Sequence, residues 1–213
     1  MHNYKKNLKL LEDNHVYSKS MEHDACGVGL VASTEGKKSK KVVEYAIEAL
    51  KAVWHRGAVD ADGKTGDGAG IHLEIPSDFF AEKIELVGHE HDDSEICVGM
   101  IFLPRNNYAA QESCRTLVEK ELTKSHFTIY GWRQVPVNTK VLGEKANFTR
   151  PEITQVLFKY NNKDLVGKDL ERKLYESRRK IEKEAINSQI DGFYICSLSS
   201  KSIIYKGMFL AES

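Results

Sequence analysis

The sequence predicts an α+β fold in which helices cover antiparallel sheets. Apolar residues alternate or run together in about seven short segments, and they recur at helical spacing in about four longer ones. The predicted order contains hairpins and helix pairs rather than the regular strand-helix-strand alternation that a parallel sheet requires. The chain has 213 residues, which is enough for one sizeable domain.

Composition excludes several classes of protein. Lys and Arg together number 31, as do Asp and Glu, so no net charge favours nucleic acid as a partner. No apolar run reaches the roughly 18 to 20 residues of a membrane helix, and residues 1–25 are too polar for an anchor or a secretory signal. The four cysteines lack the close spacing of zinc or redox pairs. We therefore expect a cytoplasmic protein with no membrane partner.

The first predicted elements flank a cysteine. Residues 1–21 form a charged, weakly helical leader that has no apolar core of its own. Residues 27–32 alternate as a strand, and Cys26 stands immediately before it. Gly27 and Gly29 allow another backbone or a ligand to approach the thiol closely. Residues 43–54 then show the most regular helical spacing in the chain, and this helix is expected to end near Arg56.

A glycine- and aspartate-rich loop follows over residues 57–70. It differs from a phosphate-binding P-loop, because five residues separate Gly57 from Gly63 where that motif has four, and a helix precedes it instead of a strand. It also leads into a strand rather than a helix, which argues against a dinucleotide-binding loop. We expect a tight, internally hydrogen-bonded turn system, in which Asp67 and Gly68 have structural roles.

The remaining elements follow from periodicity and from turn residues. Residues 96–103 form a continuous apolar run that ends at Pro104, which is typical of a strand buried on both faces. Residues 193–198 and 202–209 are expected to pair as a hairpin. The other predicted segments are strands 71–75, 127–137 and 153–160, helices 77–87, 107–124 and 167–189, and a loop at 136–151. Ser77 is the predicted N-cap of the first of these helices.

Cys26 is the candidate nucleophile. If residues 1–25 were removed, the freed α-amino group would lie on the same residue as the thiol, and its reference pKa is about 7.7 to 8.0. Such an amine can act as the base that activates its own side chain. For the other three cysteines, which lie in apolar segments, we expect buried positions: Cys97, Cys114 and Cys196.

Several motifs together resemble one family. They are Asp24-Ala-Cys-Gly-Val-Gly-Leu, His55-Arg-Gly-Ala, Ala61-Asp-Gly-Lys-Thr-Gly-Asp-Gly-Ala-Gly, Tyr130-Gly-Trp-Arg-x-Val-Pro, Phe193-Tyr-Ile-Cys-Ser-Leu-Ser and Tyr205-Lys-Gly. In this order the chain resembles the N-terminal part of the large subunit of glutamate synthases. The resemblance extends from about Tyr17 to the last residues. Trp132 and Arg133, within the fourth motif, are expected to be structural.

The resemblance implies a class II glutamine amidotransferase domain of the N-terminal-nucleophile hydrolase type. Its fold would be a four-layer αββα sandwich of two antiparallel sheets between helices, incomplete in this chain. Residues 1–25 would be a leader that is removed, and residues 26–213 the first part of the domain, truncated at its C-terminal side. Cys26 would be the nucleophile, and Arg56 would stabilise its thiolate or bind the substrate carboxylate. No metal site is implied.

The implied reaction is hydrolysis of glutamine to glutamate and ammonia through a cysteinyl thioester. The ammonia would pass to a synthase region, absent from these residues, that makes glutamate from 2-oxoglutarate. No cofactor is implied for this segment, whereas FMN and an iron-sulfur cluster are implied for the full-length subunit. The implied partners are the rest of that subunit and a small reductase subunit. In a plant or an alga the location would be the plastid.

Two alternatives stay open. The His-Asn-Gly-Glu motif that supplies oxyanion donors in this family, and the Arg-Phe-Ser-Thr-Asn motif that holds the substrate carboxylate, do not occur in the 213 residues. We therefore expect this piece alone to be inactive. One alternative is a class II amidotransferase that delivers ammonia to a different acceptor, and the other is a non-catalytic interaction fragment.

Overall fold

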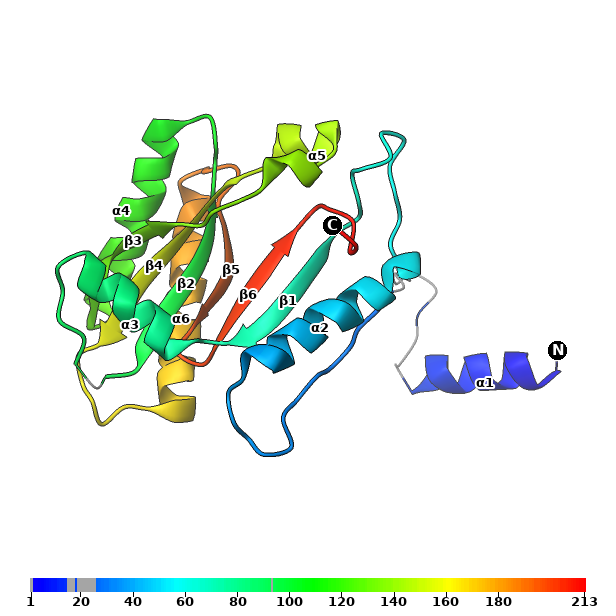
Figure 1. Ribbon diagram of the computed structural model, residues 1–213, viewed down its shortest axis with the longest axis horizontal. Helices are drawn as coiled ribbons and strands as arrows, with labels where there is room; N and C mark the ends of the chain where they lie inside the picture. Colours follow the sequence, from blue (N-terminus) through cyan, green and yellow to red (C-terminus); the bar gives the residue numbers. More distant parts are fainter. Residues whose placement is uncertain (1, 15–17, 19–25, 93) are drawn as a thin grey trace.

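The computed structural model describes residues 2–14, 18, 26–92 and 94–213. It is a mixed α+β structure with antiparallel sheets, as the sequence predicts (Figure 1). In chain order its elements are α1 (His2–Asp13), α2 (Lys40–Ala52), η1 (Trp54–Arg56), β1 (Ala69–Glu74), α3 (Ser77–Leu86), β2 (Ile96–Leu103), α4 (Tyr108–Lys124), β3 (Phe127–Gln134), η2 (Thr139–Val141), α5 (Glu144–Thr149), β4 (Glu152–Tyr160), α6 (Gly167–Asn187), β5 (Tyr194–Ser199) and β6 (Ser202–Gly207).

The larger sheet has four strands in the order β3-β4-β2-β5, and its neighbouring strands are antiparallel. At its centre, β2 pairs with β4 through Gly99 and Val156 and with β5 through Gly99 and Leu198. A Cβ atom on Gly99 would lie 2.7 Å from a methyl carbon of Val156 and 2.8 Å from one of Leu198. Glycine at this position therefore lets the neighbouring side chains close over the strand.

Both faces of this sheet are buried. Alternate residues of β2 enter two apolar clusters, with Cys97 and Ile101 in one and Val98 and Met100 in the other. The first cluster contains residues of α4 and α6, and the second contains residues of α3, β1 and β6. The prediction that residues 96–103 form a strand buried on both faces is confirmed.

The helices on the first face lie in the predicted segments 107–124 and 167–189 and bury one side each. In α6 the buried residues include Leu170, Leu174, Ile181 and Ala185, which recur at helical spacing. In α4 the buried residues are Gln111, Cys114, Val118 and Leu122, and the side chain of Asn107 accepts a hydrogen bond from the N–H group of Ala110 at the N-cap.

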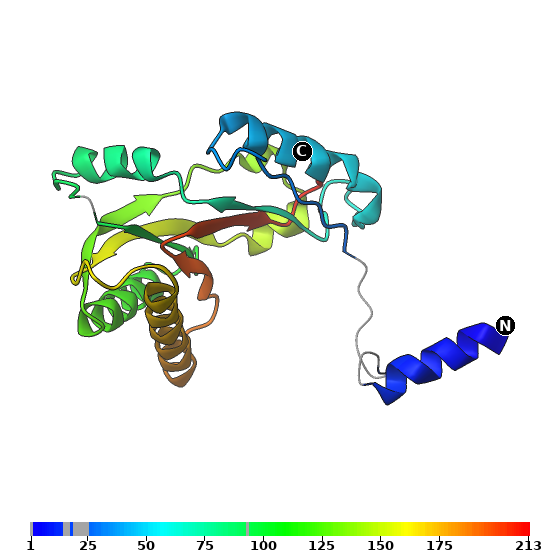
Figure 2. The ribbon, with the colours of Figure 1, turned by 90° about the horizontal axis from the view of Figure 1, so that it is seen from below.

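The second sheet contains β1 and β6, which pair antiparallel with Ile71 opposite Tyr205. In both views α2 lies along β1, and α1 lies apart from the other elements (Figures 1 and 2). None of the residues of α2 is buried, and Tyr45 and Ile47 are exposed. The helix is present as predicted, but its apolar face is only partly covered.

A chain of side-chain hydrogen bonds connects the two sheets. The guanidinium of Arg133 in β3 donates to Gln155 Oε1 at 2.7 Å, and Gln155 Nε2 lies 3.1 Å from the hydroxyl of Tyr205 in β6. Gln155 has no exposed surface. Arg133 and Tyr205, which belong to two of the motifs, are therefore linked through a buried glutamine, and this link connects β6 to the larger sheet.

Three predictions about secondary structure are wrong. Strands β5 and β6 do not form a hairpin but belong to different sheets, because β5 pairs with β2 and β6 pairs with β1. The turn between them is held by the carboxylate of Glu171, which accepts hydrogen bonds from Ser199 and Ser200. The segment 136–151 is not an irregular loop, because it contains η2 and α5. Ser77 is the first residue of α3, and the N-cap is Pro76.

The predicted strand at 27–32 is also absent from the structure. These residues are not paired with any described strand, and the side chains of Val28 and Leu30 are exposed. Alternation predicts which residues share a face, but a strand also needs a partner for its backbone hydrogen bonds.

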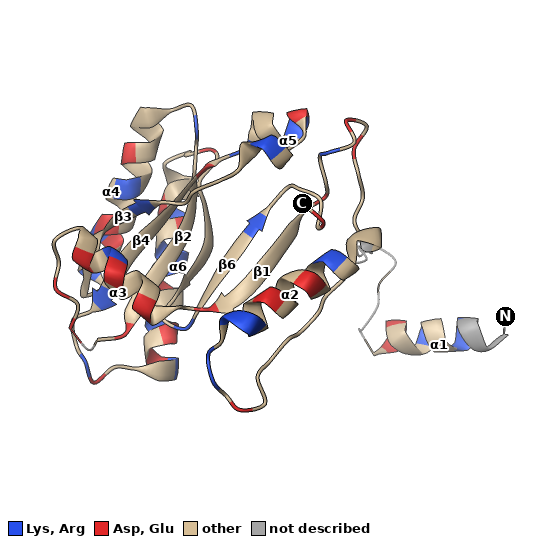
Figure 3. Cartoon of the chain, in the orientation of Figure 1, with Lys and Arg blue, Asp and Glu red and all other residues tan. Residues whose placement is uncertain are grey.

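Charged residues of both signs are interspersed along α2, α3 and α6 (Figure 3). Among the described residues, no helix combines the length and the apolar character that crossing a membrane would need.

Candidate active site around Cys26

Cys26 lies at a cavity of about 230 Å³ and is the exposed one of the four cysteines. Besides Cys26 and Gly27, three segments that are distant in sequence form the cavity. The first is the end of α2 with η1, the second is the glycine loop between η1 and β1, and the third is the chain after β6. The lining residues are Cys26, Gly27, Leu50, Val53, Trp54, Gly57, Ala58, Val59, Asp67, Gly68, Ala69, Phe209, Leu210, Ala211 and Glu212.

The cavity is small, and its lining contains both apolar and acidic side chains. Its volume is below the roughly 300 to 1,000 Å³ of sites for drug-sized ligands. Leu50, Val53 and Phe209 contribute apolar surface, while Asp67 and Glu212 contribute carboxylates. A thiol at the edge of such a cavity can reach a carbonyl carbon of a molecule of amino-acid size.

Arg56, the second predicted site residue, is the last residue of η1. Trp54 and Gly57, close to it in sequence, line the cavity, whereas Arg56 is not among the lining residues. The side chain of Arg56 lies outside the described part of the structure, and its role stays a prediction. The same applies to the leader boundary, because residues 19–25 are not described.

The glycine loop is the internally bonded turn system that the sequence predicts. Val59 and Gly66 form an isolated antiparallel bridge, and the N–H group of Asp60 donates to the carbonyl of Thr65 at 2.8 Å. Gly63 takes a φ of +69°, which favours glycine, and its N–H group donates to the carbonyl of Asp60 at 2.9 Å. The loop is therefore a narrow double strand whose base lies at the cavity.

Asp62 organises the turn. Its carboxylate accepts hydrogen bonds from the Thr65 hydroxyl at 2.6 Å and from the N–H groups of Thr65 and Lys64 at 2.7 and 2.9 Å. These hydrogen bonds hold the pKa of Asp62 well below its usual range, with the Thr65 hydroxyl as the largest cause. The Lys145 ammonium donates to Asp60 at 2.7 Å and lowers the pKa of that carboxyl as well.

The third wall of the cavity, residues 209–212, was not predicted. It is placed by close backbone contacts with the glycine loop, because a Cβ atom on Gly66 would lie 2.7 Å from the carbonyl oxygen of Phe209. A Cβ atom on Gly70 would likewise lie 2.8 Å from the carbonyl oxygen of Tyr205. The density of glycines in the loop was the available signal, since repeated glycines indicate close approach of another backbone.

The other three cysteines differ from Cys26 in burial, as predicted. Burial raises the pKa of Cys114 to about 11, and it raises the pKa values of Cys97 and Cys196. These thiols are poor nucleophiles, because the thiolate is the reactive form.

The described residues do not fit a metal site or an iron-sulfur cluster. They contain no group of three or more His, Cys, Asp or Glu side chains that could hold a metal ion. No step of the chemistry below is routed through such a group.

Comparison with known proteins gives a consistent result. The family model for class-II glutamine amidotransferases matches residues 26–213 and so begins at Cys26. The chain is 54% identical over 209 residues to the glutamate synthase [NADPH] large chain of Azospirillum brasilense, covering 98% of this chain and 14% of that protein.

Two ferredoxin-dependent enzymes are also similar. Ferredoxin-dependent glutamate synthase 2 of Synechocystis is 39% identical over 188 residues, covering 88% of this chain and 12% of that protein. The chloroplastic/mitochondrial ferredoxin-dependent glutamate synthase 1 of Arabidopsis thaliana is 40% identical over 196 residues, covering 90% of this chain and 12% of that protein. The chain thus spans about one-seventh or less of the length of these relatives.

Proposed function

The chain belongs to the class II glutamine amidotransferases, and on this premise we propose that it is the glutaminase portion of a glutamate synthase large subunit. The observation that carries the proposal is the position of Cys26. It is an exposed thiol on a cavity of amino-acid size, and it is also the residue at which the family match begins.

We propose that removal of residues 1–25 precedes activity. While the peptide bond to Ala25 is intact, the nitrogen of Cys26 is an amide and cannot accept a proton near neutral pH. After cleavage, the α-amine takes the proton of the thiol, directly or through a water molecule. The match of the family to residues 26–213 supports this boundary.

The first chemical step is then attack of the Cys26 thiolate on the side-chain amide carbon of glutamine. A carbon-sulfur bond forms, and the amide oxygen becomes an oxyanion. The protonated α-amine of Cys26 returns its proton to the amide nitrogen, the carbon-nitrogen bond breaks, and ammonia leaves. The product on the enzyme is a glutamyl thioester.

The second step is hydrolysis of the thioester. The α-amine of Cys26 takes a proton from water, and the resulting hydroxide attacks the thioester carbon. The carbon-sulfur bond then breaks, which releases glutamate and regenerates the thiol. Arg56, the last residue of η1, would stabilise the thiolate or bind the substrate carboxylate.

The layer order of a four-layer αββα sandwich is part of the proposal. Support comes from the order of contacts, in which α4 and α6 cover one face of the larger sheet, while β1, β6 and α3 cover the other. Helix α2 lies beyond β1, on the side away from the larger sheet (Figures 1 and 2). The two sheets would then be the inner layers, with helices outside them.

The wider function is proposed because the relatives are glutamate synthases, and it follows what resemblance to that family implies. Ammonia from the cavity would pass to a synthase region of the same subunit, which would make glutamate from 2-oxoglutarate with FMN and an iron-sulfur cluster. A small reductase subunit would be a further partner. The location would be the cytoplasm, or the plastid in a plant or an alga, since one relative is named chloroplastic/mitochondrial.

The test uses the longest polypeptide that the gene encodes, and it measures release of glutamate from glutamine. Cys26→Ala should lower the rate by at least about 10³-fold, because it removes the nucleophile. The matched control is Cys196→Ala, which removes a buried thiol away from the cavity and should leave the rate nearly unchanged. The mature protein should begin at Cys26 by N-terminal sequencing.

Two results would contradict the proposal. A Cys26→Ala protein that hydrolyses glutamine as fast as the control would exclude Cys26 as nucleophile. An active protein whose N-terminus is Met1 would exclude its α-amine as base. Glutamate formation from added ammonia should survive Cys26→Ala, and its loss would point instead to a structural role for this residue.

A further inference from the structure

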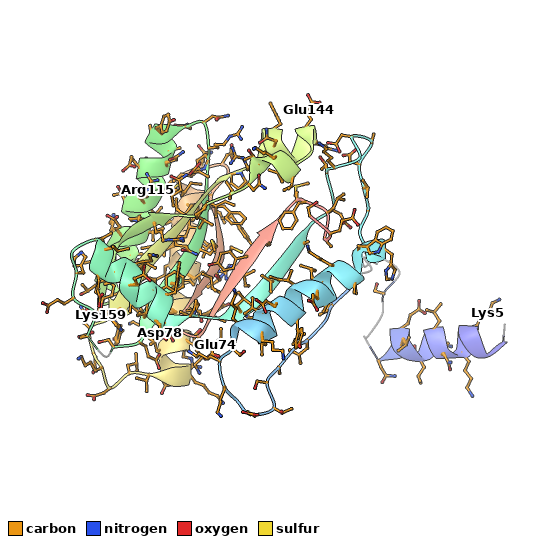
Figure 4. The ribbon with its side chains drawn as sticks, viewed as in Figure 1. Lys5, Glu74, Asp78, Arg115, Glu144 and Lys159 are labelled. Carbon is orange, nitrogen blue, oxygen red and sulfur yellow. The ribbon has the colours of Figure 1, made fainter. Side chains whose placement is uncertain are left out.

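The tip of the glycine loop packs against the first turn of α5, a segment that the proposed chemistry does not use. Figure 4 labels Glu144 at the start of α5, beside this loop. The N-cap of α5 is Gly143, which has no side chain to accept hydrogen bonds from the first turn. The side chains of Asp62 and Thr65 occupy that place instead.

The contacts are specific. Thr65 is 3% exposed, and its hydroxyl oxygen accepts a hydrogen bond from the N–H group of Ala146 at 3.4 Å while donating to Asp62 at 2.6 Å. The backbone N–H group of Lys145 also contributes to the lowered pKa of the Asp62 carboxyl. The Lys145 side chain in turn donates to Asp60 at 2.7 Å. Two elements about 80 residues apart are thus fastened by polar groups on both sides.

Gly143 makes this contact possible. A Cβ atom at position 143 would lie 2.1 Å from the Thr65 hydroxyl oxygen and 2.3 Å from a carboxylate oxygen of Asp62. No side chain fits in that space without moving the loop. We refer to the set Asp62, Thr65 and Gly143 as the loop latch.

The latch and the nucleophile's cavity lie at opposite ends of the same narrow double strand. From Thr65 the chain passes through Gly66, which pairs with Val59, to Asp67 and Gly68 in the cavity wall. The N–H group of Asp67 donates to the carbonyl of Ala58 at 3.2 Å, so the two limbs are also hydrogen-bonded to each other at the cavity. A change in the position of the tip is therefore transmitted to the wall within two or three residues.

We propose that Thr65 and Asp62 are positioning residues, which hold the loop wall of the Cys26 cavity at the separation that glutamine requires. This inference rests on the proposed glutaminase function and adds residues that do not touch the substrate. Loss of the latch lets the wall move outward, which weakens binding of glutamine-shaped molecules. It leaves the thiol itself equally accessible and reactive.

The test compares two reagents on the longest polypeptide that the gene encodes. The first is 6-diazo-5-oxo-L-norleucine, which has the shape of glutamine and must bind before it alkylates a thiol. The second is iodoacetamide, which needs no binding site. Thr65→Val keeps the shape of the side chain and removes its hydrogen bonds. It should raise the concentration of the first reagent for half-maximal inactivation by about three- to tenfold, as expected for one or two lost hydrogen bonds.

Three further variants distinguish a specific effect on the cavity wall from a general effect on folding. Thr65→Ser keeps the hydroxyl and should restore the wild-type value. Thr149→Val makes the same change in α5 at a hydroxyl that contacts only carbonyls of its own helix, and it should have no effect. Asp62→Asn weakens the same latch at an exposed position, so that the proposal stays testable if Thr65→Val does not fold. The rate with iodoacetamide should stay within about twofold in every variant.

The possible outcomes are distinct. Equal sensitivity of wild type, Thr65→Val and Asp62→Asn to the glutamine-shaped reagent overturns the positioning role. Equal changes in the rates with both reagents overturn it as well, because they indicate general loosening of the fold. If wild-type Cys26 reacts with iodoacetamide but not with the glutamine-shaped reagent, the proposed function fails, and this inference fails with it.

Discussion

Helices α2 and α6 have similar amphipathic sequence patterns but very different surroundings. Helix α6 buries five residues against the larger sheet, and Ile181 and Leu174 have no exposed surface. Helix α2 buries none, and its Ile47 is 41% exposed. Periodicity therefore tells which face of a helix is apolar, but it does not tell what covers that face.

The same contrast separates the two halves of the structure. The larger sheet with α4 and α6 contains the buried cysteines Cys97 and Cys114, whereas the exposed Cys26 lies near α2, β1 and the chain after β6. The closely packed core thus lies around the larger sheet, whereas the candidate nucleophile lies outside it. Reactive groups need access and room, which a closely packed core excludes.

The largest expected difference comes from one substitution made in both helices. Ile181→Ala should lower the free energy of unfolding by about 2 to 5 kcal/mol, because it leaves a cavity in the core. Ile47→Ala makes the same chemical change on an exposed face and should cost less than about 1 kcal/mol. Urea titration measures both free energies of unfolding. The slope of the free energy against urea concentration should be the same in the variants and in the wild type. A similar cost for the two variants would show that α2 is packed more closely than the structure indicates.

A second prediction compares the cysteines of the two regions. At pH 8, iodoacetamide should modify Cys26 and leave the other three thiols largely unmodified. Because the pKa of Cys114 is raised from 9.0 to about 11, its thiolate fraction at pH 8 is lower by about 100-fold. The rate for Cys114 should rise about tenfold per pH unit until the pH reaches about 11.

Peptide mass spectrometry after brief labelling gives the rate for each cysteine. Labelling in urea serves as the control, since all four thiols should then react alike. Native labelling of Cys97 or Cys114 as fast as that of Cys26 would remove the distinction between a closed core and an accessible site.

The sequence predicts the elements around the larger sheet better than it predicts those around the cavity. The helix α6 and the strand β2 were predicted correctly, because local periodicity and burial agree there. The wrong hairpin prediction concerns β6, whose pairing with β1 is a long-range choice that local pattern does not encode. Cys26 and the glycine loop were found through their residue types, whereas residues 209–212 became part of the site only through the fold.

The smallest predicted effect concerns the link between the two regions. Gln155→Leu removes the amide that joins Arg133 to Tyr205 and leaves both groups without this partner. Because Arg133 is only half-buried and can turn toward water, we expect the lower part of the usual range, about 1 to 2 kcal/mol of unfolding free energy. Gln155→Glu keeps an acceptor for both neighbours and should cost less.

The effect on the site distinguishes a link from an ordinary core contact. If the hydrogen bonds from Arg133 to Tyr205 position β6, Gln155→Leu should also weaken the binding of the glutamine-shaped reagent. The reason is that residues 209–212 of the cavity wall follow shortly after β6. Ile181→Ala, although more destabilising, should not do so under conditions where the protein is folded. The contrary result would be a loss of reagent affinity that is larger in Ile181→Ala than in Gln155→Leu, in proportion to the loss of unfolding free energy. Apolar packing would then hold β6, and the hydrogen bonds through Gln155 would add nothing to the geometry of the cavity.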